Sequence, residues 1–150
     1  MAYLETRLKT IMKFFLAVLL LCSFQGFAQS KITVQVSNFK NNKGICRACI
    51  FNSEASFNDS KALQCVEVTV ANKAAQAFFD NVTEGTYAIF VIHDANGNNK
   101  MDKNFLGIPS EGYGASKNNL PFAAAPTFEG NKFTVTKGFN YTFKIRLRNL

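Results

Sequence analysis

Thr86-Tyr87-Ala88-Ile89-Phe90-Val91-Ile92-His93 is the stretch that decides the fold, because it is apolar at almost every position. Successive side chains of a β-strand point to opposite faces of its sheet. A run that is apolar on both faces is therefore predicted to be a central strand, covered on both sides. The rest of the chain lacks the 3.6-residue apolar period of a long amphipathic helix, which favours a β-rich protein.

Shorter strand-like segments, separated by turn residues, lie on either side of this run. They occupy residues 32–36, 44–51, 65–70, 74–79, 133–135 and 141–147. With the central run they make about seven strands in about 120 residues, the density of a β-sandwich. We expect an all-β fold, an antiparallel sandwich of the immunoglobulin type, with a barrel as the alternative. The last two segments are expected to pair as a hairpin around Lys137-Gly138.

The first part of the chain has the features of an export signal. Lys13 precedes the apolar run 14–21, and Gly26-Phe27-Ala28 supplies the small residues that a signal peptidase reads. We expect residues 1–28 to be a cleaved signal peptide and residues 29–150 to be one exported domain, periplasmic or extracellular. The apolar run is shorter than the about 20 residues that span a bilayer, so no membrane span is expected after cleavage.

Three cysteines follow the expected cleavage site, and an oxidising compartment would allow one pair to bond. Cys46 and Cys49 lie three residues apart on one strand, so their side chains point to opposite faces, about 10 Å apart. Cys65 is therefore expected to pair with one of the two. Cys49 is preferred, because it and Cys65 both lie on outward faces. Zinc is not expected, since neither a second Cys-x-x-Cys motif nor ligand-spaced histidines are present.

A long segment rich in Gly, Asn and Pro follows the central strand, from Asp94 to Gly130. Loops longer than about 15 residues are usually functional or disordered. The apolar residues of this segment favour order, because they predict that it packs against the sandwich. They are Phe105, Ile108, Tyr113, Phe122 and Phe128.

The first nine residues of this segment resemble the start of an EF-hand calcium loop. In that pattern, oxygen-bearing side chains stand at positions 1, 3, 5 and 9, and a backbone carbonyl serves position 7. The corresponding residues are Asp94, Asn96, Asn98, Asp102 and, for the carbonyl, Lys100. Carboxylate, amide and carbonyl oxygens are the ligands of a hard cation, so the segment predicts a site for Ca²⁺.

Two departures from the EF-hand pattern bear on this prediction. Asn99 stands at position 6 in place of glycine, and Phe105 stands at position 12 in place of the bidentate glutamate. Glu111 is the carboxylate that would then complete the shell, and the affinity expected for such a site is about 10⁻⁴–10⁻³ M. The alternative is turn chemistry alone, in which Asp and Asn side chains bond to nearby backbone N–H groups.

The residues leave three hypotheses for function. The first is a non-catalytic exported sandwich with a calcium-binding loop and a ligand- or partner-binding surface at residues 94–128. The second is a hydrolase that uses the only histidine with neighbouring polar residues. Its residues would be His93, Asp94, Glu111 and Ser116. The third is an envelope-associated structural or interaction protein, with an envelope protein or polysaccharide as its partner.

The basic charge does not indicate a nucleic-acid protein, although the formal net charge is +7. Lys144, Arg146 and Arg148 are the one basic cluster, and they alternate with apolar residues as the solvent face of a strand does. No nucleic-acid partner is therefore expected.

Several motifs together resemble one bacterial family. They are Gly85-Thr86-Tyr87-Ala88, His93-Asp94-x-Asn96-Gly97-Asn98 with Asp102, Gly107-Ile108-Pro109-x-Glu111-Gly112-Tyr113-Gly114-x-Ser116, and Pro126-Thr127-Phe128. This combination resembles domain of unknown function 2141 over nearly all of the mature chain. The resemblance implies an exported protein of this size, with no activity to carry over. The Gly-Thr-Tyr strand is also similar to those of transthyretin-like, carboxypeptidase-regulatory sandwiches, which implies a related fold.

Overall fold

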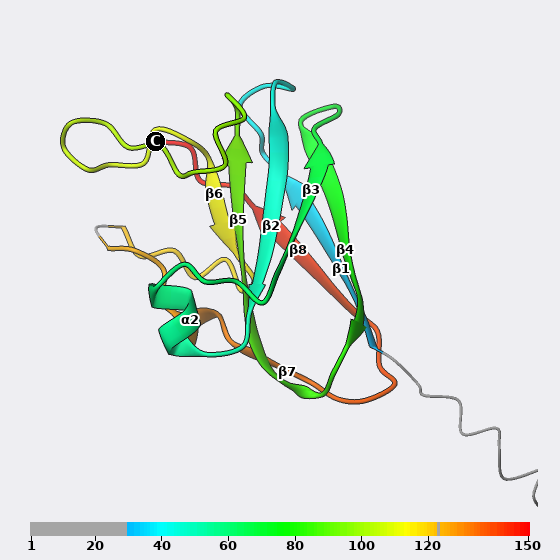
Figure 1. The fold of residues 1–150 in the computed structure, drawn as a ribbon. Coiled ribbons are helices and arrows are strands. Elements are labelled where there is room, and N and C mark those ends of the chain that lie inside the picture. The colour runs from blue at the N-terminus through cyan, green and yellow to red at the C-terminus, as the bar shows by residue number, and fades with distance from the viewer. Residues whose placement is uncertain (1–29, 123) are drawn as a thin grey trace, which may run out of the picture.

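The computed structural model describes residues 30–122 and 124–150, and it confirms an all-β fold (Figure 1). Its strands form one sheet of three strands and one of five. In chain order the elements are β1 (Ser30–Ser37), β2 (Ile45–Phe51), α2 (Glu54–Asn58), β3 (Gln64–Thr69), β4 (Ala74–Val82), β5 (Gly85–Asp94), β6 (Tyr113–Ala115), α3 (Phe128–Asn131), β7 (Phe133–Val135) and β8 (Tyr141–Arg146). The chain therefore adopts the predicted sandwich architecture.

The predicted signal peptide lies outside the residues that the structure describes. Among the described helices, none is both long enough and apolar enough to cross a membrane.

β1 is the middle strand of the smaller sheet, with β4 antiparallel on one side and β8 parallel on the other. Its buried residues Ile32, Val34 and Val36 alternate with more exposed ones, as the sequence predicts. The parallel pair joins the first described strand to the last, with Ile32 opposite Tyr141. The expected antiparallel sandwich thus contains one parallel pair.

β7 and β8 do not form the predicted hairpin around Lys137-Gly138. β7 pairs with β5 in the larger sheet, where Phe133 lies opposite Tyr87, whereas β8 pairs with β1 in the smaller sheet. The turn after β7 therefore carries the chain from one sheet to the other. The hairpin prediction is wrong because turn residues mark where a chain changes direction, and not which strand it then joins.

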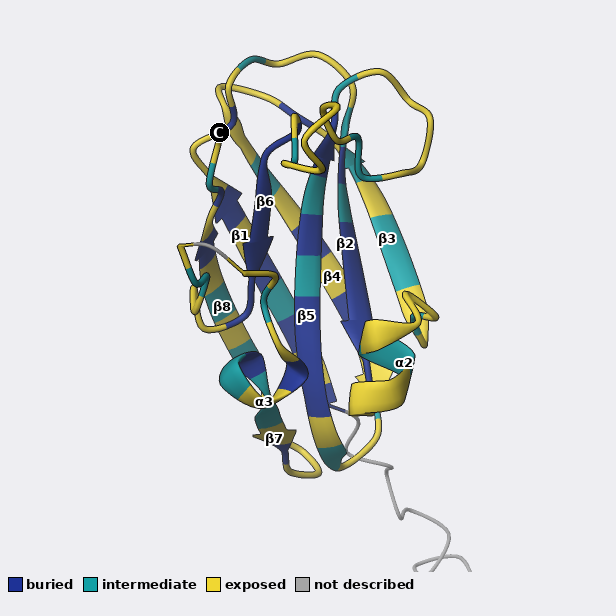
Figure 2. Cartoon of the chain, turned by 90° about the vertical axis from the view of Figure 1, so that its left-hand side faces the viewer, coloured by how far each residue is buried: buried dark blue, intermediate teal, exposed yellow. Residues whose placement is uncertain are grey.

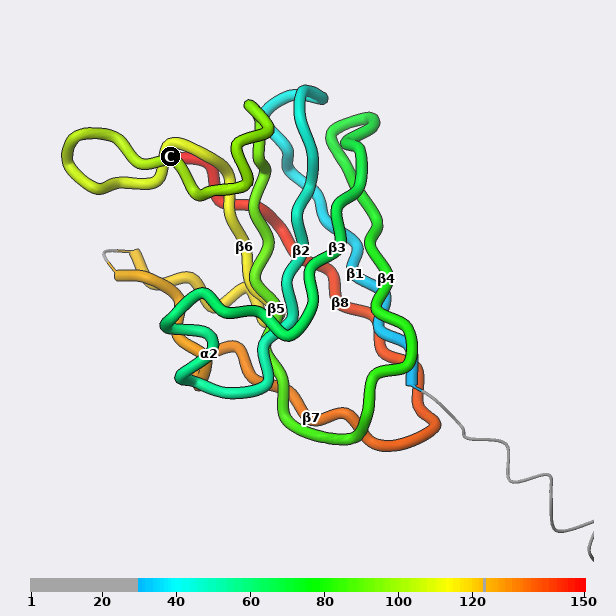
Figure 3. The backbone as a smooth tube through the Cα atoms, in the orientation of Figure 1, coloured from blue at the N-terminus to red at the C-terminus, as the bar shows by residue number. Residues whose placement is uncertain are grey.

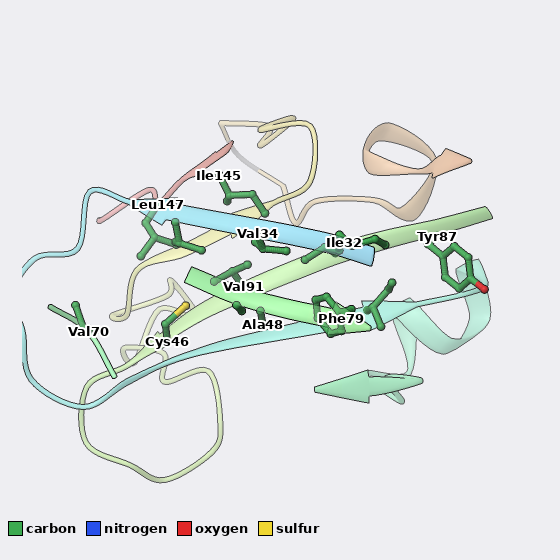
Figure 4. Packing of buried hydrophobic residues seen from close by; sticks show 14 of the residues in the cluster. Ile32, Val34, Cys46, Ala48, Val70, Phe79, Tyr87, Val91, Ile145 and Leu147 are labelled. Carbon is green, nitrogen blue, oxygen red and sulfur yellow. The ribbon is translucent and has the colours of Figure 1, made fainter. Parts of the chain in front are cut away.

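β5 is the central strand of the larger sheet and is buried along most of its length, as its apolar run predicts. β2 lies along one side of it, and β7 and β6 share the other side. Val91 of β5 packs in the core between the sheets with Phe79 of β4 and Val34 of β1 (Figure 4). One face of β5 is thereby covered by the smaller sheet.

Two short helices cover part of the other face of the larger sheet (Figure 2). α2 begins at the N-cap Ser53, whose hydroxyl accepts a hydrogen bond from the N–H of Ser56. Phe57 of α2 and Phe128 of α3 lie with ring centroids 6.2 Å apart, and they pack with Phe90 of β5 in a second apolar cluster. This cluster explains how β5 is buried on both faces without a parallel βαβ sheet.

Cys49 and Cys65 form a disulfide bond, as predicted. They lie opposite each other on β2 and β3, with their Cα atoms 4.1 Å apart, at the edge of the second apolar cluster. Cys46 is a buried free thiol, and burial raises its pKa from 9.0 to about 12. A thiol with such a pKa is protonated at neutral pH and a poor nucleophile.

Candidate functional site

The acidic loop (residues 94–111) begins where β5 ends and leads back toward β6 (Figure 3). Asp94, the last residue of β5, is fully buried. Its Oδ1 accepts hydrogen bonds from the N–H groups of Gly97 at 2.7 Å and Asn98 at 3.1 Å, and its Oδ2 accepts one from Asn99 at 2.7 Å. The loop is thus folded around this carboxylate, which is the turn chemistry that the sequence offered as the alternative reading.

Glu111 closes the acidic loop from its far end. Its Oε1 accepts a hydrogen bond from the backbone N–H of Ala95 at 3.0 Å, and its Oε2 accepts one from the backbone N–H of Asp102 at 3.2 Å. The side chain is buried although it stands sixteen residues after Ala95 in the sequence. Glu111 therefore returns to the start of the loop, and its expected role as a cation ligand stays a prediction.

Asp102 is held by the two asparagine side chains that the calcium pattern singled out. Nδ2 of Asn96 donates to Oδ2 of Asp102 at 2.6 Å, and Nδ2 of Asn98 donates to Oδ1 at 2.8 Å. The backbone N–H of Asn98 also donates to Asp94, so this one residue joins the two carboxylates. The structure therefore brings Asp94, Asn96, Asn98, Asp102 and Glu111 into one hydrogen-bonded network.

The sixth position of the loop has the backbone conformation for which the EF-hand pattern uses glycine. Asn99 has a φ of 61°, in the left-handed region that asparagine adopts more readily than most residues. Its carbonyl accepts a hydrogen bond from the guanidinium of Arg47 at 3.0 Å. Lys100 donates its N–H to Oδ1 of Asn98 at 2.9 Å, and the role expected for its carbonyl stays a prediction.

The carboxylates of the acidic loop keep unused acceptor capacity. A carboxylate offers about four lone-pair sites. Asp94 accepts three hydrogen bonds from protein groups, and Asp102 and Glu111 accept two each. In the described part of the chain, however, no three His, Cys, Asp or Glu side chains are grouped closely enough to hold a metal ion. A cation here would therefore need amide or backbone oxygens as well.

The structure places Ser116 apart from His93, although Glu111 returns to the residues that follow His93 and Asp94. His93 is buried on β5, where its Nε2 lies 2.8 Å from the carbonyl of Lys43. Ser116 donates its hydroxyl to the carbonyl of Asn131 at 2.6 Å and accepts from the N–H of Ile89. Residues 89 and 93 are four apart on one strand, a separation of about 13 Å. The serine is thus engaged far from the histidine, and the geometry does not favour a nucleophile–base pair.

The apolar residues of the long segment divide into two groups. Tyr113 and Phe128 are buried and pack against the sandwich, as expected. Phe105, Phe122 and Ile108 are 94%, 98% and 41% exposed, so for these three the expectation of packing is wrong. The turn residues Asn104 and Gly107 beside Phe105 were a signal in the sequence that this part of the loop reverses in solvent.

Fold and loop together define a β-sandwich protein that carries a network of carboxylates and amides at one end of its central strand. The model of the family DUF2141, described as an uncharacterised protein conserved in bacteria, matches residues 34–142. The match runs from the middle of β1 to the start of β8 and covers more than half of the chain, so the chain belongs to this family. No curated protein and no solved structure matches the chain.

Proposed function

We propose that this chain is an exported, non-catalytic β-sandwich whose acidic loop binds a hard cation, with Ca²⁺ as the best fit. The observation that carries the proposal is the network that joins three carboxylates, two of them buried, through backbone and amide N–H groups. Each of these carboxylates keeps acceptor capacity that a hard cation could use together with amide and backbone oxygens. Segment 94–128 would then present a surface for a ligand or partner in the cell envelope.

The donor chemistry fits a hard cation of low affinity. All candidate ligands carry oxygen, which Ca²⁺ prefers. Turning the carboxamides of Asn96 and Asn98 about χ2 would exchange Nδ2 for Oδ1 beside Asp102. The turn would break two hydrogen bonds from backbone N–H groups, each worth about 1 kcal/mol. That loss is consistent with a Kd of about 10⁻⁴–10⁻³ M.

Calcium titration tests the cation directly. We expect heat release in isothermal titration and a rise in Tm of about 5 °C in about 10 mM Ca²⁺ relative to EDTA. Asp102→Asn should abolish both responses and leave the Tm in EDTA nearly unchanged, because Asp102 contacts amide side chains and not the core. Asp59→Asn, an exposed acid paired with Lys61, is the matched control and should keep the response.

Two results would contradict the cation proposal. One is a wild-type Tm that does not differ between Ca²⁺ and EDTA. The other is an equal loss of response in the Asp59 and Asp102 variants, which would indicate nonspecific screening of surface charge.

Export is supported by the Cys49–Cys65 disulfide, because such bonds persist in oxidising compartments. It is tested separately: the full chain is expressed in a bacterial host, and the mass of the protein released from the periplasm is measured by mass spectrometry. We expect the mass of a chain that begins at Gln29. A cytoplasmic protein of full-length mass would refute this part of the proposal.

A further inference from the structure

The acidic loop carries an apolar tip that consists of Phe105, Leu106 and Ile108. These side chains are 94%, 67% and 41% exposed. Single exposed apolar residues are common on protein surfaces, but three of them on one turn form a cluster that points to an interaction.

Hydrogen bonds fix the conformation of the turn that carries the apolar tip. Oδ1 of Asn104 accepts hydrogen bonds from the N–H groups of Leu106 at 2.9 Å and Ile108 at 3.0 Å. The N–H of Asn104 donates to the carbonyl of Ile108 at 2.8 Å, and Gly107 supplies a φ of 76°. Lys103 pairs with Pro109 at the base of the turn. The turn therefore presents its apolar side chains to solvent in a preorganised form.

Positive charge flanks the apolar tip. Lys100 and Lys103 precede it and are exposed. The nearby carboxylates of Asp102 and Glu111 are directed into the loop, where they accept hydrogen bonds from loop groups. The charges presented beside the tip are thus the two lysines.

A second exposed aromatic residue lies on a neighbouring loop. Phe122 is 98% exposed, and the chain before it is fixed by Arg148, whose guanidinium donates to the carbonyls of Leu120 at 2.6 Å and Pro121 at 2.7 Å. Figure 1 shows this loop and the acidic loop projecting from the same side of the sandwich. Loops that carry Phe105 and Phe122 on one side of the sandwich are compatible with a partner that has a flat surface.

We propose that the apolar tip docks this protein onto a lipid bilayer with anionic headgroups, with Phe105 and Leu106 entering the interface. A convex turn of three side chains offers far less than the about 800 Å² that one partner contributes to a stable protein interface. Binding to a bilayer does not require a pocket of complementary shape. Aromatic and aliphatic side chains flanked by lysines bind the interface of an anionic bilayer. This inference goes beyond the proposed function and does not require the cation.

The experiment uses a chain beginning at Gln29, which retains every described strand, in EDTA throughout. Because the protein has no tryptophan, Phe105→Trp introduces a single fluorescent reporter. We expect its emission to shift to shorter wavelength with vesicles of phosphatidylglycerol and phosphatidylethanolamine, and to be quenched by brominated acyl chains. Phe139→Trp is the matched control, because Phe139 is also exposed but lies on the β7–β8 turn.

Vesicle co-sedimentation then measures affinity. The double variant Phe105→Ser, Leu106→Ser should bind at least about tenfold more weakly, since two apolar side chains leave the interface. Lys100→Glu with Lys103→Glu should weaken binding to anionic vesicles, whereas Lys144→Glu on β8 should not. High salt should also weaken binding.

Three results would overturn the proposal. The first is an unchanged Phe105→Trp spectrum with anionic vesicles, and the second is an equal response of the two tryptophan reporters. The third is a wild-type dimer in analytical ultracentrifugation that the serine variant converts to a monomer, because the tip would then cover a second copy of the chain.

Discussion

Asn99 shows how one residue supports the geometry of the acidic loop. Its N–H donates to the buried carboxylate of Asp94, and this requires the chain to turn through a φ of 61°. Asparagine adopts this conformation at a modest energetic cost, whereas a β-branched residue is strongly disfavoured there. Asparagine at position 6 is therefore compatible with the positive φ that the loop adopts there.

Substitutions at Asn99 test this interpretation at the residue scale. Asn99→Gly should leave the free energy of unfolding unchanged or slightly higher, because glycine adopts positive φ without strain. Asn99→Val should lower it by about 1–2 kcal/mol. Urea denaturation followed by circular dichroism measures both, and a valine variant as stable as the wild type would contradict the argument.

At the scale of elements, the Cys49–Cys65 bond joins β2 to β3 and closes the segment that contains α2. The cysteines are 16 residues apart in sequence. Phe57 of α2 packs on Phe51 of β2 with ring centroids 5.0 Å apart, so the disulfide and the aromatic cluster stabilise the same part of the larger sheet. A short helix of five residues would not persist without this support.

Removal of the disulfide is expected to lower the free energy of unfolding by about 3 kcal/mol, the loop-entropy value for a closed loop of this length. The double variant Cys49→Ala, Cys65→Ala should show this loss in urea denaturation. Reduction of the wild type with dithiothreitol should reproduce it, and the reductant should have no effect on the double variant. Equal stability of the oxidised and reduced wild type would refute the role assigned to this bond.

At the scale of the whole molecule, the parallel pair of β1 and β8 makes the fold depend on its last strand. β8 contributes Ile145 to the core, and Leu147 is the first residue after β8. Both side chains are almost fully buried. Asn38 donates to the carbonyl of Leu147 at 2.8 Å, which adds a contact between distant parts of the chain. Such long-range pairing closes a long loop of chain, which carries a cost in chain entropy.

Deletion of residues 141–150 should therefore abolish cooperative folding, because it exposes the edge of β1 and removes two buried side chains from the core. Deletion of Leu150 alone is the control and should leave the Tm nearly unchanged, since this residue is exposed. Thermal melts by circular dichroism distinguish the two. A cooperative melt of the longer deletion near the wild-type Tm would show that β8 is dispensable.

Local properties of the chain are those that the sequence alone determined. The alternation in β1 and the doubly apolar run of β5 specify strands and their buried faces, because side-chain direction alternates along every strand. The same geometry excluded a Cys46–Cys49 bond and left Cys65 as the partner. The oxygen-rich spacing of residues 94–102 likewise identified the loop, because it depends only on residues close in sequence.

Only the tertiary structure decided how these local parts meet. It placed β7 and β8 in different sheets, brought Glu111 back to Ala95, and left Phe105 and Phe122 in solvent. An apolar residue in a loop favours burial, but whether a buried surface lies within reach depends on strands far away in sequence. Strand pairing and loop exposure follow from the balance of chain entropy and packing over the whole domain, which no local pattern contains.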